Sequence, residues 1–169
     1  MAARSADPVI FLEHKGLYRK VQAQTNEPDS DYVIPFGKGR IVREGKDLTI
    51  VTWGYTVHLA MEAARQLEID GKSIEVLDLR SIAPLDDELI ARSVRKTSRV
   101  LVAHEDSLTM GFGAEVAARI GQNCFEYLDA PVRRVATEDT FVPTAPNLEA
   151  EVLPSASGLR TAAEELLRW

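Results

Sequence analysis

The residues best suited to chemistry stand close together in RVLVAHEDSLTMGFGAEVAARI, residues 99–120. His104, Glu105 and Asp106 follow an apolar run, and open α/β sheets place their ligands at the carboxyl ends of such strands. A histidine beside carboxylates can move protons near neutral pH, so His104 and Glu105 are the candidate catalytic residues. The second histidine of H-E-x-x-H and a G-x-S-x-G nucleophile are both missing from the sequence. The alternative is that both side chains satisfy backbone groups or face a neighbouring domain, and the missing partners favour it.

The glycines that follow could instead belong to a phosphate-binding turn. A dinucleotide fingerprint needs G-x-G-x-x-G directly after a strand, and here Val116 stands where the third glycine belongs after Gly111 and Gly113. A tight turn between a strand and a helix also needs glycine. The pattern therefore favours a close-packed turn over a nucleotide site.

The other polar candidates have structural explanations. Thr56 follows Trp53-Gly54-Tyr55 and can cap a helix that starts there, and His58 falls in that helix's first turn, where we expect it to be packed or solvated. Cys124 has no basic neighbour in the sequence and is interpreted as a small core residue. It is the single cysteine, and no Cys/His spacing predicts a metal site.

Composition excludes several classes of partner. The chain has 20 Lys and Arg against 26 Asp and Glu, and the basic residues are scattered, which argues against nucleic acid as a partner. The apolar run near the start is interrupted by Glu13 and Lys15, which is not the pattern of a signal peptide, and no stretch has the length of a membrane span. We expect a cytoplasmic protein with no membrane partner.

Hydrophobic patterning predicts alternating strands and helices. Strands are expected at 9–12, 39–45, 48–53, 73–79, 99–104 and 130–137, and helices at 57–71, 84–96, 111–120 and 159–169. Residues 22–38 are rich in Asn, Pro, Asp, Ser and Gly without an apolar period, which indicates a linker and a domain boundary. This alternation is typical of an α/β fold with a mostly parallel sheet and right-handed crossovers.

Six segments in order resemble one family. They are FLEHKGLYR, GKGRIVREGKDLTIVTWG, VLDLRSIAPLD, VAHEDSLTMGFGAEVAARI, YLDAPVRRVATEDT and LPSASGLRTAAEELLRW. Together they resemble the C-terminal half of the β subunit of thiamine-diphosphate-dependent 2-oxo acid dehydrogenases, the pyruvate and branched-chain enzymes. The resemblance implies a transketolase C-terminal-like domain over residues 39–169. Its fold would be a three-layer α/β/α sandwich with a mostly parallel five-stranded sheet. Residues 1–20 would be the end of the pyrimidine-binding domain, and 21–38 a linker.

The resemblance also implies which functions this chain has. The family's parent enzyme uses thiamine diphosphate and Mg²⁺, but its cofactor-activating acid lies in the pyrimidine-binding domain, nearly all of which is missing here. We therefore expect a fragment that binds no cofactor and has no independent turnover, with an assembly and docking role. The implied partners are the α subunit, a second β subunit and the subunit-binding domain of the dihydrolipoyl acyltransferase, with Asp129 and the carboxylate of Trp169 as candidate docking residues. The alternative is a free-standing α/β enzyme or ligand-binding domain that uses His104 and Glu105.

Overall fold

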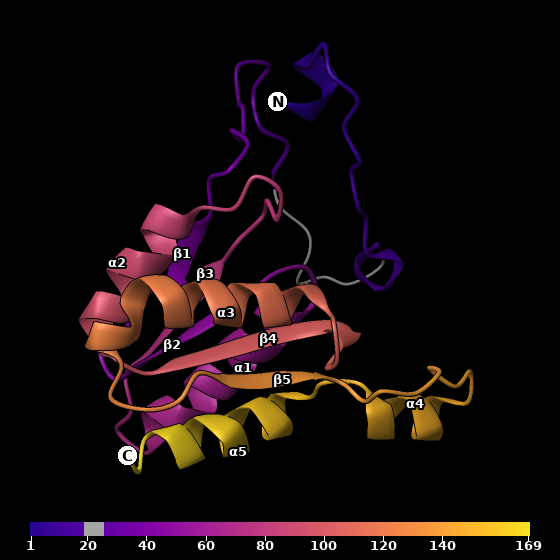
Figure 1. Cartoon of the computed structure of the whole chain (residues 1–169). Helices are drawn as coiled ribbons and strands as arrows, with labels where there is room; N and C mark the ends of the chain where they lie inside the picture. The colour runs from indigo at the N-terminus through magenta and orange to yellow at the C-terminus, as the bar shows by residue number, and fades with distance from the viewer. Residues whose placement is uncertain (19–25) are drawn as a thin grey trace.

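A five-stranded sheet forms the middle of the fold (Figure 1). The computed structural model describes residues 1–18 and 26–169. The strands are β1 (Arg40–Arg43), β2 (Leu48–Thr52), β3 (Ile74–Asp78), β4 (Val100–Ser107) and β5 (Arg133–Thr137), in the order β1-β3-β2-β4-β5. Strand β1 pairs antiparallel with β3, and the pairs β2–β3, β2–β4 and β4–β5 are parallel. The predicted mostly parallel five-stranded sheet is confirmed.

Helices cover both faces of this sheet, as apolar central strands require. Every residue of β2 and β3 is buried. On one face α1 (Thr56–Ile69) and α5 (Ala156–Leu166) pack their small and aliphatic side chains against the sheet, and on the other α2 (Asp87–Thr97) and α3 (Phe112–Cys124) do the same. Figure 1 shows the resulting three layers, which confirm the predicted α/β/α sandwich.

Shorter elements complete the described chain. Three-residue 3₁₀ helices lie at η1 (Ala2–Arg4), η2 (Lys15–Leu17) and η4 (Phe125–Tyr127). Helix α4 (Pro146–Val152), which the apolar pattern did not predict, starts with proline in its first turn. No helix in the described part of the chain combines the length and the apolar character needed to cross a bilayer.

Three local predictions are wrong. Residues 9–12 form no strand: they lie in irregular chain with Ile10 88% exposed, and none of the described strands pairs with them. Apolar character alone cannot make a strand, because its backbone groups need a partner. Strand β4 continues to Ser107, past the predicted end at residue 104. Thr56 does not cap α1, because its hydroxyl donates to the carbonyl of Trp53 at 2.6 Å.

The predicted linker is described only in part. Residues 26–38 contain neither helix nor strand, in keeping with their turn-rich composition. Residues 19–25, which include the start of the predicted linker, lie outside the described residues.

Candidate functional site

The candidate residues gather where β2 and β4 end and α3 begins. We call this set, consisting of His14, Trp53, Tyr55, His104 and Glu105, the carboxyl-edge site. Parallel neighbouring strands bring their carboxyl ends to one edge of the sheet, so Trp53 after β2 stands beside His104 on β4. His14 comes from the N-terminal segment, far away in the sequence.

His104 is enclosed within the fold and does not reach solvent. Its side chain is fully buried, and its ring stacks on Trp53 with the centroids 5.2 Å apart and the planes 5° apart. The edge of Phe112 packs on the same Trp53 at 5.8 Å. Neither Nδ1 nor Nε2 of His104 has a hydrogen-bond partner among the described residues.

Burial also determines the charge of His104. Loss of solvent lowers the pKa of its imidazole below the ordinary value; the negative charge of Asp106 opposes this, and the nearby Arg134 adds a smaller lowering effect. The side chain is therefore neutral at pH 7. A neutral, enclosed imidazole without a relay partner is placed for packing rather than for proton transfer.

The two glycines of the turn make room for this imidazole. A Cβ on Gly113 would lie 2.1 Å from Nε2 of His104, and a Cβ on Gly111 would lie 2.1 Å from the carbonyl oxygen of Ser107. Asp106 meets the start of α3, where its Oδ2 accepts a hydrogen bond from the amide of Phe112 at 3.2 Å. The space beside Gly113 holds a side chain and the helix end already holds a carboxylate. The interpretation of the glycines as a close-packed turn is confirmed.

Glu105 has a different partner from His104. Its Oε2 lies 2.9 Å from Nε2 of His14, and both side chains are about one-third exposed. The ring of His14 also stacks on Tyr55, with centroids 5.2 Å apart. The structure therefore does not join His104 and Glu105 into one pair, because successive residues of a strand point to opposite faces.

Sequence reasoning did not single out His14 as a site residue. The contact joins residues about ninety positions apart, and no local pattern encodes such a pairing. The structure also shows why Gly16 stands nearby, since a Cβ at that position would lie 2.8 Å from the His14 ring.

The candidate docking residues lie at the other edge of the sheet, where the parallel strands begin. Asp129 precedes β5, and Trp169 ends the chain after α5 (Figure 1). The side chain of Asp129 is 58% exposed and lies 3.4 Å from Nη1 of Arg99, and Trp169 is 69% exposed. Both side chains are accessible, and neither is near the carboxyl-edge site.

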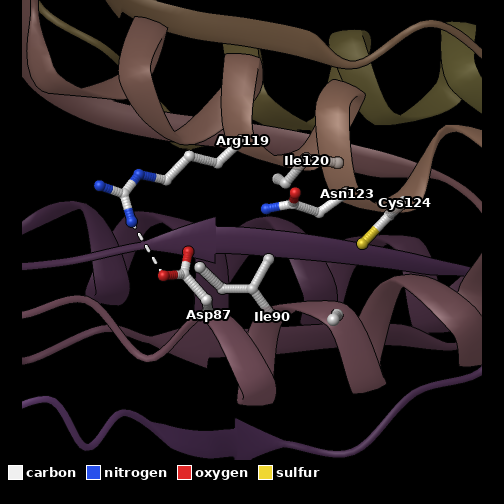
Figure 2. A pocket seen from close by; sticks show the side chains of 7 residues that line it. Asp87, Ile90, Arg119, Ile120, Asn123 and Cys124 are labelled. Carbon is white, nitrogen blue, oxygen red and sulfur yellow. Dashed lines mark hydrogen bonds and ion pairs between the residues drawn. The ribbon is translucent and has the colours of Figure 1, made fainter.

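Cys124 is a core residue, as expected. It is buried, and burial raises the pKa of its thiol, with smaller effects from charged neighbours. Figure 2 shows it in a small pocket between α2 and α3, next to Ile120 and Asn123. The ion pair between Asp87 and Arg119, 2.8 Å long, stands at the side of this pocket, which has space for little more than a water molecule.

His58, the other polar candidate, is half-buried, and its ring is tilted against Tyr55 with the ring centroids 6.2 Å apart.

Comparison with known proteins places this architecture. Residues 37–159 match the family described as the C-terminal domain of transketolase. The chain belongs to the transketolase C-terminal domain family. A solved structure of this type, titled as a split-gene transketolase in an inactive β4 tetramer, superposes with a TM-score of 0.73 and is 33% identical. The match covers 83% of this chain and 45% of that one.

Curated relatives of this transketolase C-terminal domain are β subunits of larger enzymes. The 2-oxoisovalerate dehydrogenase subunit beta of Bacillus subtilis (strain 168) is 42% identical over 169 residues, covering 99% of this chain and 51% of the relative. The mitochondrial pyruvate dehydrogenase E1 component subunit beta-1 of Arabidopsis thaliana is 44% identical over 164 residues, or 96% of this chain and 45% of the relative. The chain spans about half the length of these relatives.

Proposed function

We propose that this chain is the C-terminal domain of the β subunit of a 2-oxo acid dehydrogenase of the pyruvate or branched-chain type. That enzyme carries out oxidative decarboxylation and acyl transfer to lipoyl groups, and this domain serves assembly and docking in a cytoplasmic complex. The observation that carries the proposal is identity above 40% to such β subunits along nearly the whole chain. The enclosed, neutral His104 supports a structural role over the free-standing enzyme alternative.

The residues described here do not fit thiamine diphosphate and its Mg²⁺. Within residues 1–18 and 26–169 no group of three or more His, Cys, Asp or Glu side chains could hold a metal ion. At the glycine turn that starts α3, His104 packs against Gly113, and the Asp106 carboxylate already accepts the amide of Phe112, where a phosphate would meet a negative charge. No step of the proposed function is therefore assigned to this domain's own side chains.

The proposed partners fall on different parts of the surface. Exposed apolar side chains at Ile10, Phe11 and Leu12 support burial of the N-terminal segment against the α subunit or a second β subunit. The exposed Asp129 and the C-terminal Trp169 support docking of the acyltransferase's subunit-binding domain, through basic side chains of that partner.

Calorimetry tests the assignment of cofactor binding. Titrating thiamine diphosphate with Mg²⁺ into the purified chain should give no binding heat, because the site lies in other parts of the enzyme. Binding with micromolar affinity would contradict the proposal.

Complex formation tests the assembly role. The α subunit of the Bacillus subtilis relative, added to the chain, should form a complex detectable by size-exclusion chromatography. A chain that stays monomeric beside it while turning over a substrate through His104 would favour the free-standing alternative.

A truncation tests the docking role. Removal of Arg168 and Trp169 should weaken binding of the subunit-binding domain by more than about tenfold if the tail is a central contact. Met110→Ser, which changes an exposed side chain at the opposite edge of the sheet, is the control and should leave the affinity unchanged. Equal affinity of the truncated and intact chains would remove Trp169 from the docking site.

A further inference from the structure

Four exposed apolar side chains lie on the segments that follow β4 and β5. Met110 is 94% exposed, Phe141 97%, Leu148 52% and Val142 48%. We call these four residues the β5–α4 surface. Single exposed apolar residues are ordinary, but several on neighbouring loops mark a contact site.

Hydrogen bonds hold these loops together. The amide and hydroxyl of Thr109 donate to the carboxylate of Asp139 at 2.9 and 2.5 Å. The amide of Glu138 donates to the carbonyl of Val152 at 3.1 Å, which ties the end of α4 to the start of the loop. Met110 follows directly after Thr109, and Phe141 stands two residues after Asp139. Hydrogen bonds therefore join the segments that carry these apolar residues, which follow β4 and β5 (Figure 1).

The charge around this surface has one sign. Residues 138–151 contain Glu138, Asp139, Glu149 and Glu151 and no Lys or Arg. All four acids are exposed, and in the described part of the chain none of them forms an ion pair. The hydrogen bonds from Thr109 lower the pKa of Asp139, so this carboxylate keeps its charge.

One cation lies close by, but its hydrogen bond is made within the fold. Arg134 on β5 is half-buried, and its Nη1 donates to the carbonyl of Leu108. The charge that a partner meets at the loop and α4 is therefore negative.

We propose that the β5–α4 surface binds a basic, apolar segment of a partner protein. Exposed apolar side chains among unpaired acids are complementary to aliphatic side chains flanked by lysine or arginine. A second copy that presented the same surface would set acids against acids, which opposes a symmetric contact. Asp129 and Trp169 lie at the opposite edge of the sheet, so this contact is separate from the proposed tail docking and does not depend on it.

A pair of synthetic peptides tests the proposal on the full chain. One peptide has leucines at helical spacing and lysines elsewhere, about 14 residues long, and the other replaces every lysine with glutamate. Fluorescence anisotropy should show the lysine peptide binding at least about tenfold more tightly than the glutamate peptide. Phe141→Ser combined with Leu148→Ser should weaken the lysine peptide about tenfold, and so should Glu149→Lys combined with Glu151→Lys.

A matched control distinguishes peptide binding at the β5–α4 surface from nonspecific electrostatic attraction to the acidic chain. Phe125 on η4 is 78% exposed and lies away from α4, so Phe125→Ser should leave peptide binding unchanged. Circular dichroism should show that all variants are folded. Equal binding of the lysine peptide to the Phe141/Leu148 variant and to the parent chain would mean attraction to the net charge of -6 only, and would overturn the proposal. Self-association of the chain that the same variant abolishes would also overturn it, in favour of a second copy as the occupant.

Discussion

At the scale of single residues, His104 shows how the same residue type can serve two purposes. Histidine beside acids at a strand end suggested proton chemistry, whereas the structure uses the imidazole as a flat, neutral packing unit between Trp53 and the glycine turn. The residue types and the strand end were predictable from the sequence. Burial was not, because it depends on α3 packing over β4, a contact that follows from the tertiary fold.

The lowered pKa of His104 predicts acid sensitivity. The unfolded chain takes up a proton as the pH falls below about 6.5, whereas the folded imidazole does so only at lower pH. This contribution to stability is complete above pH 6.5 and is lost as the pH falls towards the folded pKa, with a slope of at most about 1.4 kcal/mol per pH unit. His104→Leu should remove that component from urea unfolding curves measured between pH 7 and pH 5. Phe112→Leu, which changes packing on the same Trp53 without a titrating group, should keep the slope of the parent chain.

The contact between Gly113 and His104 predicts that alanine substitutions at two glycines of α3 change the free energy of unfolding in opposite directions. Gly113→Ala would place a methyl group 2.1 Å from Nε2, so overpacking should cost about 1–3 kcal/mol of the free energy of unfolding. Gly121→Ala in the same helix has nothing within 4 Å and should stabilise the protein by about 0.5–1 kcal/mol through helix propensity. Thermal unfolding of both variants checks this. Equal effects of the same sign would show that the Gly113 contact relaxes at no cost.

At the scale of elements, prediction succeeded where the pattern was local. Helix α2 illustrates this, because the sequence places acids at its start and basic residues at its end, as the helix dipole favours. In the structure Asp86 caps the helix by accepting a hydrogen bond from the amide of Leu89 at 3.1 Å. Residues 9–12 failed the same test, because whether an apolar run becomes a strand depends on a partner elsewhere. Helix α4 was missed because it buries none of its residues, and so has no apolar stripe to detect.

The start of β3 contains a buried acid, and removal of the lysine that pairs with it should lower the free energy of unfolding. Glu75 is fully buried, accepts a hydrogen bond from Thr49 and pairs with Lys96, which also reaches the exposed Glu44 at 2.7 Å. Lys96→Met leaves Glu75 without its cation and should cost about 3 kcal/mol, the lower end for buried pairs, because Lys96 is partly exposed. Glu44→Gln removes only the exposed partner and should cost less than about 1 kcal/mol. Urea unfolding at pH 7 compares the two, and similar losses would contradict the assignment of Glu75 as the important partner.

The N-terminal segment should be held to the domain by His14. Its contact with Glu105 and its stacking on Tyr55 are lost in His14→Ala, so amide exchange at Leu17 and Tyr18 should speed up about fivefold. Lys15→Ala, a change at the adjacent residue, should leave these rates unchanged. In the double variant with Glu105→Gln the two effects should not add, because both remove one contact. Full additivity would mean that His14 and Glu105 act through separate neighbours.

At the scale of the whole molecule, the sheet separates two groups of contacts. The carboxyl-edge site and the β5–α4 surface lie where the parallel strands end, whereas Asp129, Trp169 and the Glu75 pair lie towards the strand starts. Alternating periodicity predicted the α/β class and the mostly parallel sheet, and the family resemblance implied the three layers. The division of the surface needed the structure, since it depends on which loops meet at each edge.

This division predicts that substitutions at the two edges change the free energy of unfolding independently of each other. In the sheet register Glu75 is level with Thr49 and Thr49 with Val100, and His104 lies four residues further along β4. At about 3.3 Å per residue the two positions are roughly 13 Å apart along the strands, beyond the range in which stability effects couple. The losses of unfolding free energy in Gly113→Ala and Lys96→Met should therefore add within about 0.5 kcal/mol in the double variant, measured by urea unfolding. A larger departure from additivity would mean that β2, which lies between the two sites, transmits strain from one edge of the sheet to the other.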